Sequence, residues 1–209
     1  MSEDISGRKS LRIEDFSDVV EGGRIGDMYD DIKKKEDLTC RERSTMVFWN
    51  VIKCPIPPDV LPGVESTIRS ALRRMGLHGT LLIYVYGDKS LLDRKHVFLK
   101  AGISYHVQRE QLSDADIEDS GEMELHVIML ADNTSERPAV IMAIPKPDQD
   151  SELHRVLKCL QSRDHDVLLV NPPVGDSGQF LESAESVLAC TQCLDGEPIT
   201  RPYCVCAYS

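Results

Sequence analysis

From Thr45 onward, short apolar runs alternate along the chain with longer segments that have one apolar face. The runs are rich in β-branched and aromatic residues, as buried strands are, whereas the longer segments show helical spacing. This alternation is typical of a parallel sheet with crossover helices, so the pattern predicts an α/β fold. Strands are expected at 45–52, 80–86, 104–108, 139–144 and 166–170.

Helices are expected between these strands. The clearest covers Val64–Met75, where apolar residues recur at helical spacing, arginines lie on other faces and Gly76 follows as a stop. Further helices are expected at 88–101, 115–131 and 151–161, and a last one begins near Gln179.

The N-terminal part has a different composition. Residues 1–44 mix charged residues, glycine and serine with isolated hydrophobes, which predicts a disordered charged arm. A docking or localisation segment around Lys33–Lys35 is the functional alternative. The predicted organisation is the arm at 1–44, a folded domain at 45–195 and a C-terminal tail at 196–209.

The chain is acidic overall. Its 209 residues include 24 Lys and Arg against 35 Asp and Glu, giving a formal net charge of -11. Because the long-range field does not attract polyanions, any RNA contact needs a local basic patch. Candidate RNA-binding residues lie on the first two expected helices: Arg69, Arg73, Arg74, Lys89, Arg94 and Lys95. Ordinary solvated helix faces are the alternative interpretation.

The apolar runs are too short to span a bilayer, and the first ten residues lack the apolar stretch of a signal peptide. We therefore expect a soluble, intracellular, cytoplasmic protein without membrane insertion. Its seven cysteines are expected to stay reduced. Cys190 and Cys193, with Cys204 and Cys206, offer thiols for zinc, but Cys-x-Cys is an unusual half-site, so zinc is not favoured.

Polar residues follow the expected strands where parallel strands share one edge of a sheet. They are Asn50, Asp88, Asp148, Asp150 and Glu152, to which the acidic stretch 110–124 can add carboxylates. Crowded carboxylates suit Mg²⁺, which could assist phosphodiester hydrolysis. Solvated caps and loop residues are the alternative, and helix capping alone accounts for Asp88.

Four motifs together indicate a family: Val-Phe-Trp-Asn-Val-Ile-Lys-Cys-Pro-Ile-Pro at 47–57, Tyr-Gly-Asp at 86–88, Leu-His-Arg-Val-Leu at 153–157 and Asp-Val-Leu-Leu-Val-Asn-Pro-Pro at 166–173. Over about 45–195 the chain resembles the NYN domain of plant proteins similar to the meiosis regulator and mRNA stability factor, also called limkain-b. The resemblance implies a PIN-like, three-layer fold with a mainly parallel sheet of about five strands. It also implies Mg²⁺-dependent ribonuclease chemistry and post-transcriptional regulation of gene expression.

The chain departs from the family pattern at the expected metal site. Asn50 stands where the family has its first metal-binding aspartate, and Lys53 replaces an asparagine. With the register anchored on Leu153-His154, Lys146 takes the place of one later aspartate and Asp148 keeps the other. A short insertion at 145–147 would instead make Asp148 and Asp150 the matching pair. Asp119 best fits the family's middle acid.

These replacements predict weak or absent nuclease activity, as in a pseudoenzyme, because an amide and a lysine weaken a hard-cation site. Any remaining activity would use Mg²⁺ or Mn²⁺ held by Asp119 and Asp148, with Asn50 as a weak third ligand. RNA binding is the leading expectation, and a non-catalytic protein-interaction module is the alternative. The resemblance also raises association with peroxisomes, although the chain ends in Cys206-Ala207-Tyr208-Ser209 rather than Ser-Lys-Leu.

Overall fold

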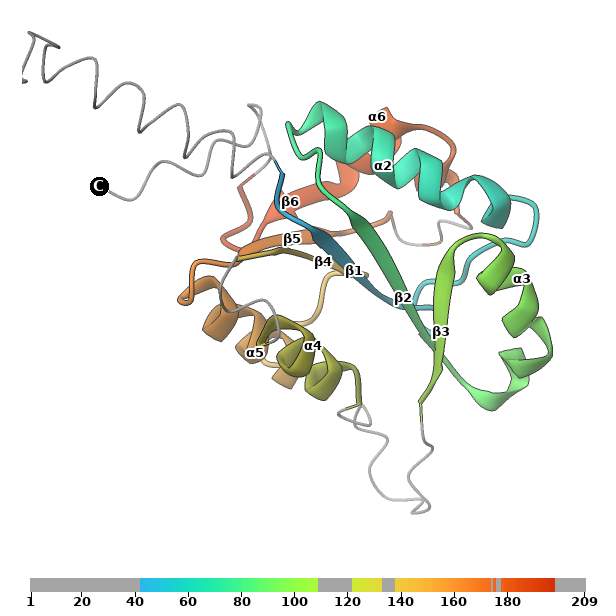
Figure 1. Cartoon of the computed structure of the whole chain (residues 1–209), viewed down its shortest axis with the longest axis horizontal. Helices are drawn as coiled ribbons and strands as arrows, with labels where there is room; N and C mark the ends of the chain where they lie inside the picture. The colour runs from blue at the N-terminus through green and yellow to red at the C-terminus, as the bar shows by residue number, and fades with distance from the viewer. Residues whose placement is uncertain (1–41, 109–121, 133–137, 174, 176–177, 198–209) are drawn as a thin grey trace, which may run out of the picture. The chain divides into compact units, whose positions relative to one another are not determined.

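A parallel sheet with helices on both faces forms the framework in a computed structural model of the chain (Figure 1). The structure describes residues 42–108, 122–132, 138–173, 175 and 178–197. The strands are β1 (Thr45–Asn50), β2 (Leu81–Gly87), β3 (Ile103–Val107), β4 (Val140–Ile144), β5 (Asp166–Val170) and β6 (Thr191–Cys193). The α-helices are α2 (Val64–Arg74), α3 (Lys95–Lys100), α4 (Glu122–Asp132), α5 (Glu152–Gln161) and α6 (Ala184–Cys190), and the 3-10 helices are η1 (Leu61–Gly63), η2 (Lys89–Arg94) and η3 (Gln179–Leu181).

The six strands form one sheet in the order β3-β2-β1-β4-β5-β6. All neighbouring pairs are parallel except β5 and β6, which are antiparallel. β1 therefore lies near the middle, with Asn50 level with Tyr86 of β2 and Trp49 level with Ile144 of β4. The carboxyl ends of the first five strands meet at the same edge of the sheet.

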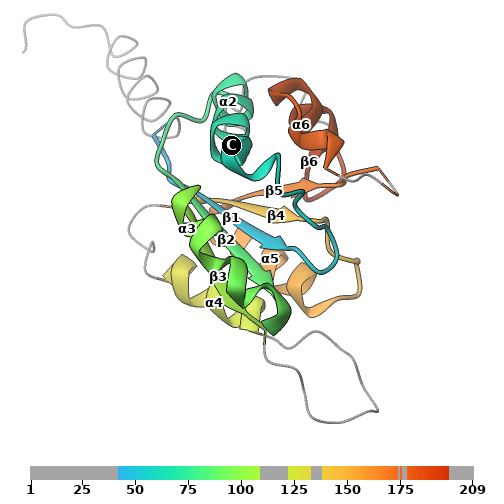
Figure 2. The ribbon, with the colours of Figure 1, turned by 90° about the vertical axis from the view of Figure 1, so that its right-hand side faces the viewer.

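Alternate side chains of the strands divide the core into two layers. On β1, Val47 and Trp49 pack in the layer that holds α2 and α6, whereas Met46 and Phe48 pack in the layer that holds α4 and α5. Figure 2 shows α2 and α6 above the sheet and α4 and α5 below it. The fold is therefore three-layer α/β with a mainly parallel sheet, as the sequence pattern and the family resemblance predict.

The structure corrects several expected boundaries. The first strand ends at Asn50 rather than residue 52. The helix expected at 88–101 is split into η2 and the shorter α3, and the last helix is split into η3 and α6. The break between η3 and α6 lies at Ser183, which is extended with φ of -148° and ψ of 159° and caps α6 by accepting from the Ser186 N–H.

The C-terminal end of the domain adds a strand that the sequence analysis missed. The family resemblance implies a helix over 183–194, but the helix is shorter in the structure, because α6 ends at Cys190 and Thr191–Cys193 form β6. Thr191 is extended, and its hydroxyl donates to the Val187 carbonyl at 2.6 Å, closing the helix end. Within the described ranges, the sheet therefore has six strands instead of about five.

Candidate functional site

The expected site residues that the structure describes follow the carboxyl ends of neighbouring strands. Asn50 ends β1, Asp88 follows β2, and Lys146, Asp148 and Asp150 follow β4. We call these five residues the strand-end rim. Because β4 lies directly beside β1, the structure brings the loop from Lys146 to Asp150 to the same sheet edge as Asn50. Asp119 lies outside the described residues.

Asn50 is buried and uses its side-chain oxygen within its own turn. The backbone N–H groups of Ile52 and Lys53 both donate to Asn50 Oδ1 at 3.0 Å. The Cys54 N–H donates to the Asn50 backbone carbonyl, also at 3.0 Å. A carbonyl oxygen has two lone pairs, so both acceptor positions of the amide oxygen are engaged. Asn50 therefore shapes the turn after β1 and is poorly suited to act as a metal ligand.

The loop after β4 is organised by backbone contacts. The Lys146 N–H donates to the Val170 carbonyl at 2.6 Å, which ties this loop to the end of β5. The Ser151 hydroxyl donates to the Asp148 carbonyl at 2.6 Å, and its oxygen accepts from the His154 N–H at 3.3 Å as the N-cap of α5. Lys146 is half-buried, whereas Asp148 and Asp150 are exposed. The carboxylates of Asp148 and Asp150 are therefore solvated, in the same loop as Lys146.

The described residues of the rim do not fit a Mg²⁺ or Mn²⁺ site. Across the described ranges, no group of three or more His, Cys, Asp and Glu side chains is placed to hold a metal ion. The rim itself offers an amide whose oxygen is engaged, a cation at Lys146 and exposed carboxylates, whereas a hard cation needs several converging oxygen ligands.

Asp88 acts as a local cap. Its side chain accepts from the Ser90 N–H at 2.9 Å, and its carbonyl accepts from the Tyr105 hydroxyl at 2.5 Å. Gly87, just before it, leaves room for this ring, since a Cβ there would lie 2.8 Å from Tyr105 Oη. These contacts give Asp88 and Gly87 a structural role at the end of β2.

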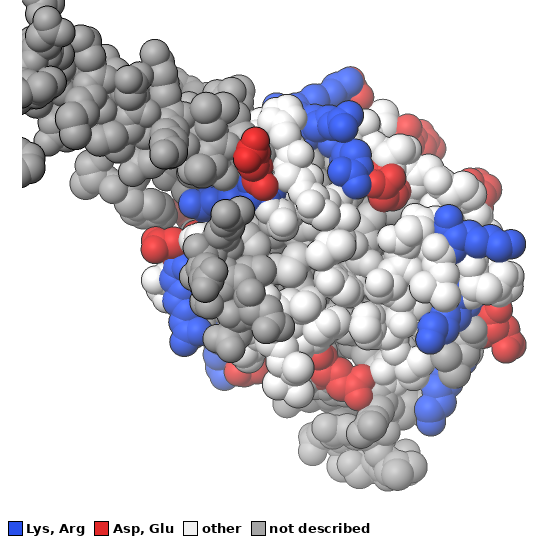
Figure 3. All heavy atoms as spheres, in the orientation of Figure 1, with Lys and Arg blue, Asp and Glu red and all other residues white. Residues whose placement is uncertain are grey.

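The candidate RNA-binding residues are divided over two regions. Figure 3 shows blue side chains over α2 and others along α3, with white and red surface between them. On α2, Arg69 pairs with Glu65 at 2.5 Å, and Arg74 pairs with Glu185 of α6. These pairs offset the charge of two of the expected phosphate contacts. Lys89, Arg94 and Lys95 belong to η2 and α3, at the β3 side of the sheet.

The four candidate zinc thiols fall on different kinds of structure or lie outside it. Cys190 ends α6 and Cys193 ends β6. Cys204 and Cys206 lie outside the described residues, so the expectation on zinc stays a prediction.

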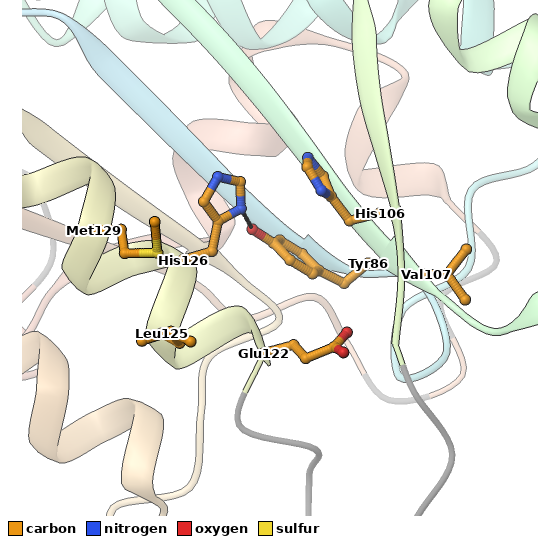
Figure 4. Close-up of a pocket in the computed structure, with 7 residues that line it drawn as sticks. All are labelled: Tyr86, His106, Val107, Glu122, Leu125, His126 and Met129. Carbon is orange, nitrogen blue, oxygen red and sulfur yellow. Dashed lines mark hydrogen bonds between the residues drawn. The ribbon is translucent and has the colours of Figure 1, made fainter.

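A hollow close to the rim contains functional groups that the sequence analysis left without a role. It has a volume of about 240 Å³ and lies between α4 and the ends of β2 and β3 (Figure 4). Its lining residues are Tyr86, His106, Val107, Glu122, Leu125, His126 and Met129. Neither histidine has a ligand spacing in sequence. The available clue was strand alternation, which puts Tyr84, Tyr86 and His106 on one face once β2 and β3 are paired.

The rings in this hollow form one packed cluster. Tyr86 and His106 lie level in the β2–β3 pairing and stack with centroids 5.4 Å apart at 21°. The His126 ring is 4.7 Å from that of His106 at 60°, and His126 Nδ1 is hydrogen-bonded to the Tyr86 hydroxyl. Phe48 and Tyr84 continue the cluster under α4.

Burial controls the protonation of these groups. It raises the pKa of Tyr86, and the nearby Tyr84, Glu124 and Glu122 act in the same direction. Burial lowers the pKa of His106 and of His126, and Lys95 lowers that of His106 further, while Glu122 partly opposes this. Both imidazoles are therefore harder to protonate than a solvated histidine, and among the residues that the structure describes, His106 Nε2 is buried without a hydrogen-bond partner.

Comparisons with known proteins show no family for the chain: no protein-family model matches it, and no curated protein does. Among solved structures, it is similar to phosphoribosylglycinamide formyltransferase from Brucella melitensis, with 15% sequence identity and a TM-score of 0.32. The match covers 67% of this chain and 63% of that chain, so the chain spans less than two thirds of that protein's length. A likeness at this level says nothing about what the chain binds.

Among the residues that the structure describes, none of the helices combines the length and apolar character needed to cross a membrane.

Proposed function

We propose that the chain is an NYN-type, PIN-like domain that binds RNA in post-transcriptional regulation of gene expression, with a degenerate and inactive metal site. The observation that carries this proposal is the strand-end rim. At the edge where the resembled family holds Mg²⁺, the chain has Asn50, whose oxygen is engaged, and Lys146 beside Asp148. Replacing anionic ligands by an amide and a cation removes metal affinity and leaves the fold available for binding.

RNA binding by this domain depends on local cations, because the net charge of -11 opposes it at long range. Lys89 and Lys95, on the β3 side of the sheet, are exposed and meet the requirement for a local patch. Each phosphate contact releases condensed counterions, so the affinity falls steeply as salt rises.

A binding assay tests the proposal. Fluorescence anisotropy with labelled single-stranded RNA should give affinity at low salt that declines as salt is added. Reversing charge in Lys89→Glu/Lys95→Glu should weaken binding at least tenfold, whereas the control Arg155→Glu, on α5 of the other layer, should change it little. Absence of affinity at the lowest salt that keeps the protein soluble would remove the RNA function.

A protein-interaction module is the second candidate, and one observation favours it. α4 exposes three large apolar side chains, with Leu125 58%, Met129 56% and Ile128 44% exposed. Side chains of this kind clustered on one helix are typical of contact surfaces for other proteins. This candidate predicts no RNA affinity together with concentration-dependent or partner-dependent burial of α4, measured as a change in hydrogen exchange of residues 122–132.

A further inference from the structure

Helix α4 is apolar on two opposite faces. Val127 and Ala131 face the sheet and are buried in the core. Leu125, Ile128 and Met129 lie on the opposite face, where they are 58%, 44% and 56% exposed. We call these three side chains the α4 ridge. Because a helix with apolar residues on both faces is normally covered on both, the ridge is expected to pack against a second surface.

The sheet face that carries α4 is open on the β2 and β3 side. Under α4 and α5, side chains of β1 and β4 such as Phe48 and Ile141 are completely buried. On β2, in contrast, Leu82 is 42% exposed and Tyr84 is half-buried. Ser104 of β3, which is level with Tyr84, is exposed as well. We call Leu82, Tyr84 and Ser104 the sheet floor.

The floor has about the width of one helix and lies beside the ridge. Two neighbouring strands are about 10 Å across, and a helix with its side chains is about 10–12 Å in diameter. Tyr84 of the floor packs against His126 of α4, with ring centroids 5.0 Å apart. Figure 4 shows His126 on the same helix as Leu125 and Met129 of the ridge. The ridge and the floor therefore form one surface with room for a helix alongside α4.

The apolar area of this surface is close to what a stable dimer needs. Leu82 and the three ridge side chains are each about half exposed. Four large side chains in this state present on the order of 300 Å² of apolar surface, the size of the patches that mark functional surfaces on monomers. An interface of standard size takes about 800 Å² from each partner, of which about 450 Å² is apolar. The four side chains therefore supply most of the apolar area of such an interface.

The ridge and the floor contain no charged side chain. Two copies of the chain can therefore meet there without burying an unpaired charge. Outside the contact, the net charge of -11 makes two copies repel each other at long range, and salt screens this repulsion. Self-association through this surface should therefore become tighter as salt is added, whereas RNA binding becomes weaker.

From this arrangement we infer that the chain forms a two-fold dimer in which the α4 ridge of each copy packs on the sheet floor of the other. A two-fold contact uses the same patch on both copies, and here the patch contains both the ridge and its counterpart. The two α4 helices then lie side by side between two sheets, each covered on both apolar faces. This inference goes beyond the proposed RNA function and does not depend on it.

Sedimentation velocity of the full chain tests the dimer. The wild type should change from monomer to dimer as its concentration rises from micromolar to millimolar, and at lower concentration when salt is high. Leu125→Lys in the ridge and Leu82→Glu in the floor should each raise the dimer dissociation constant at least tenfold, because each buries a charge in the contact. Leu99→Lys is the matched control, since Leu99 is also 58% exposed but belongs to α3. A wild type that stays monomeric at millimolar concentration and high salt would overturn the inference.

Mixing the two variants tests whether the ridge meets the floor. At a concentration where the wild type is a dimer, Leu125→Lys and Leu82→Glu should each be a folded monomer, as judged by circular dichroism. An equimolar mixture should form a heterodimer, because one contact then holds both opposite charges and the other contact is native. A mixture of folded variants that stays monomeric would contradict the pairing of ridge with floor.

Hydrogen exchange of residues 82–84 and 122–132 distinguishes the second copy from other occupants. In the proposed dimer, both segments become protected as the protein concentration rises, and Leu125→Lys abolishes this protection. Protection of a monomer at every concentration would mean that the chain covers its own surface, and protection only after a different protein is added would assign the surface to that partner. Either result overturns the dimer and leaves the RNA function, which anisotropy measures separately, unaffected.

Discussion

The amide of Asn50 sets both the hydrogen bonding and the charge at its position in the strand-end rim. Asn50 is buried and accepts two N–H groups from the turn that follows β1. Aspartate can accept the same two bonds and adds a negative charge, whereas alanine removes the acceptor oxygen and with it both bonds. The side chain at position 50 therefore has a structural task in the turn after β1, and as an amide it adds no charge to the rim.

Two substitutions separate these roles of Asn50. Asn50→Ala should lower the free energy of unfolding by about 1–2 kcal/mol, the usual cost of losing a side-chain cap. Asn50→Asp should stay within about 0.5 kcal/mol of the wild type, because the acceptor geometry is kept. Urea denaturation measures both. A loss with Asn50→Asp as large as that with Asn50→Ala would show that the turn does not depend on the acceptor.

Arg43 and Asp166 form an ion pair at the opposite edge of the sheet from the strand-end rim. Arg43 Nη1 lies 3.0 Å from Asp166 Oδ2, and both side chains are largely buried. Burial raises the pKa of Asp166 to about 6, and Arg43 opposes this rise. Because the folded pKa exceeds the unfolded one, the stability that Asp166 contributes is complete at low pH and is lost as pH rises through about 6.

Removing Arg43 should make the free energy of unfolding depend more steeply on pH. Arg43→Met should cost about 2–3 kcal/mol at pH 7, where Asp166 is ionised and left without its cation, and clearly less at pH 5, where it is protonated. The exposed pair Arg155–Glu152 is the control, and Arg155→Met should cost less than about 0.5 kcal/mol at either pH. Equal losses at pH 5 and pH 7 for Arg43→Met would contradict the account of this pair.

At the scale of elements, the connection between β5 and α6 depends on backbone geometry. Gly178, just before η3, has φ of 100°, and a Cβ there would lie 2.6 Å from Pro57 Cδ and Cγ. The close contact joins this connection to the loop after β1. Gly175 also has positive φ, at 81°, but a Cβ there would meet none of the described residues within 4 Å.

Gly175 and Gly178 can be compared directly, because both have positive φ but differ in what surrounds them. Gly175→Ala should cost about 1 kcal/mol, from backbone strain alone, whereas Gly178→Ala should cost at least about 2 kcal/mol, because a steric clash with Pro57 is added. Thermal or urea unfolding of the two variants measures the difference. Similar losses would mean that the Pro57 contact relaxes without cost.

The strands could be predicted from the sequence more completely than the contacts of the candidate site could. The five parallel strands follow from apolar runs, whose burial is visible in composition. β6 has only three residues, too few for a pattern, and its place depends on where α6 ends. The ring cluster of Tyr86, His106 and His126 depends on strand register and on the position of α4, which spacing along the chain does not contain. For the same reason, the two acceptor bonds of Asn50 could not be predicted from residue type.

For the whole molecule, the buried imidazoles predict the direction of acid sensitivity. Burial lowers the pKa of His106, His126, His154 and His165 from the ordinary value of 6.5. Their contribution to stability is present above about pH 6.5 and is lost as pH falls through the lowered values, since the unfolded chain then binds more protons. The contribution of Asp166 to stability has the opposite sign: below about pH 6, it increases as the pH falls.

Comparing the pH dependence of unfolding between the wild type and a double variant isolates the contribution of His106 and His126. Between pH 7.5 and 5.5, the variant His106→Gln/His126→Gln should lose less free energy of unfolding than the wild type, by about 1 kcal/mol, because two buried groups no longer resist protonation. Unfolding by urea at the two pH values provides the comparison. The same loss in both proteins would show that the cluster does not titrate in this range.

The central claim is that the strand-end rim is the degenerate metal site of an RNA-binding fold. Cleavage of single-stranded RNA with Mg²⁺ or Mn²⁺ tests it most directly, comparing the wild type with the variant Asn50→Asp/Lys146→Asp. The account predicts no cleavage by the wild type and metal-dependent cleavage by the variant, in which two charged ligands are returned beside Asp148. Metal-dependent cleavage by the wild type at the rate of the variant, or a folded variant that neither binds metal nor cleaves, would contradict it.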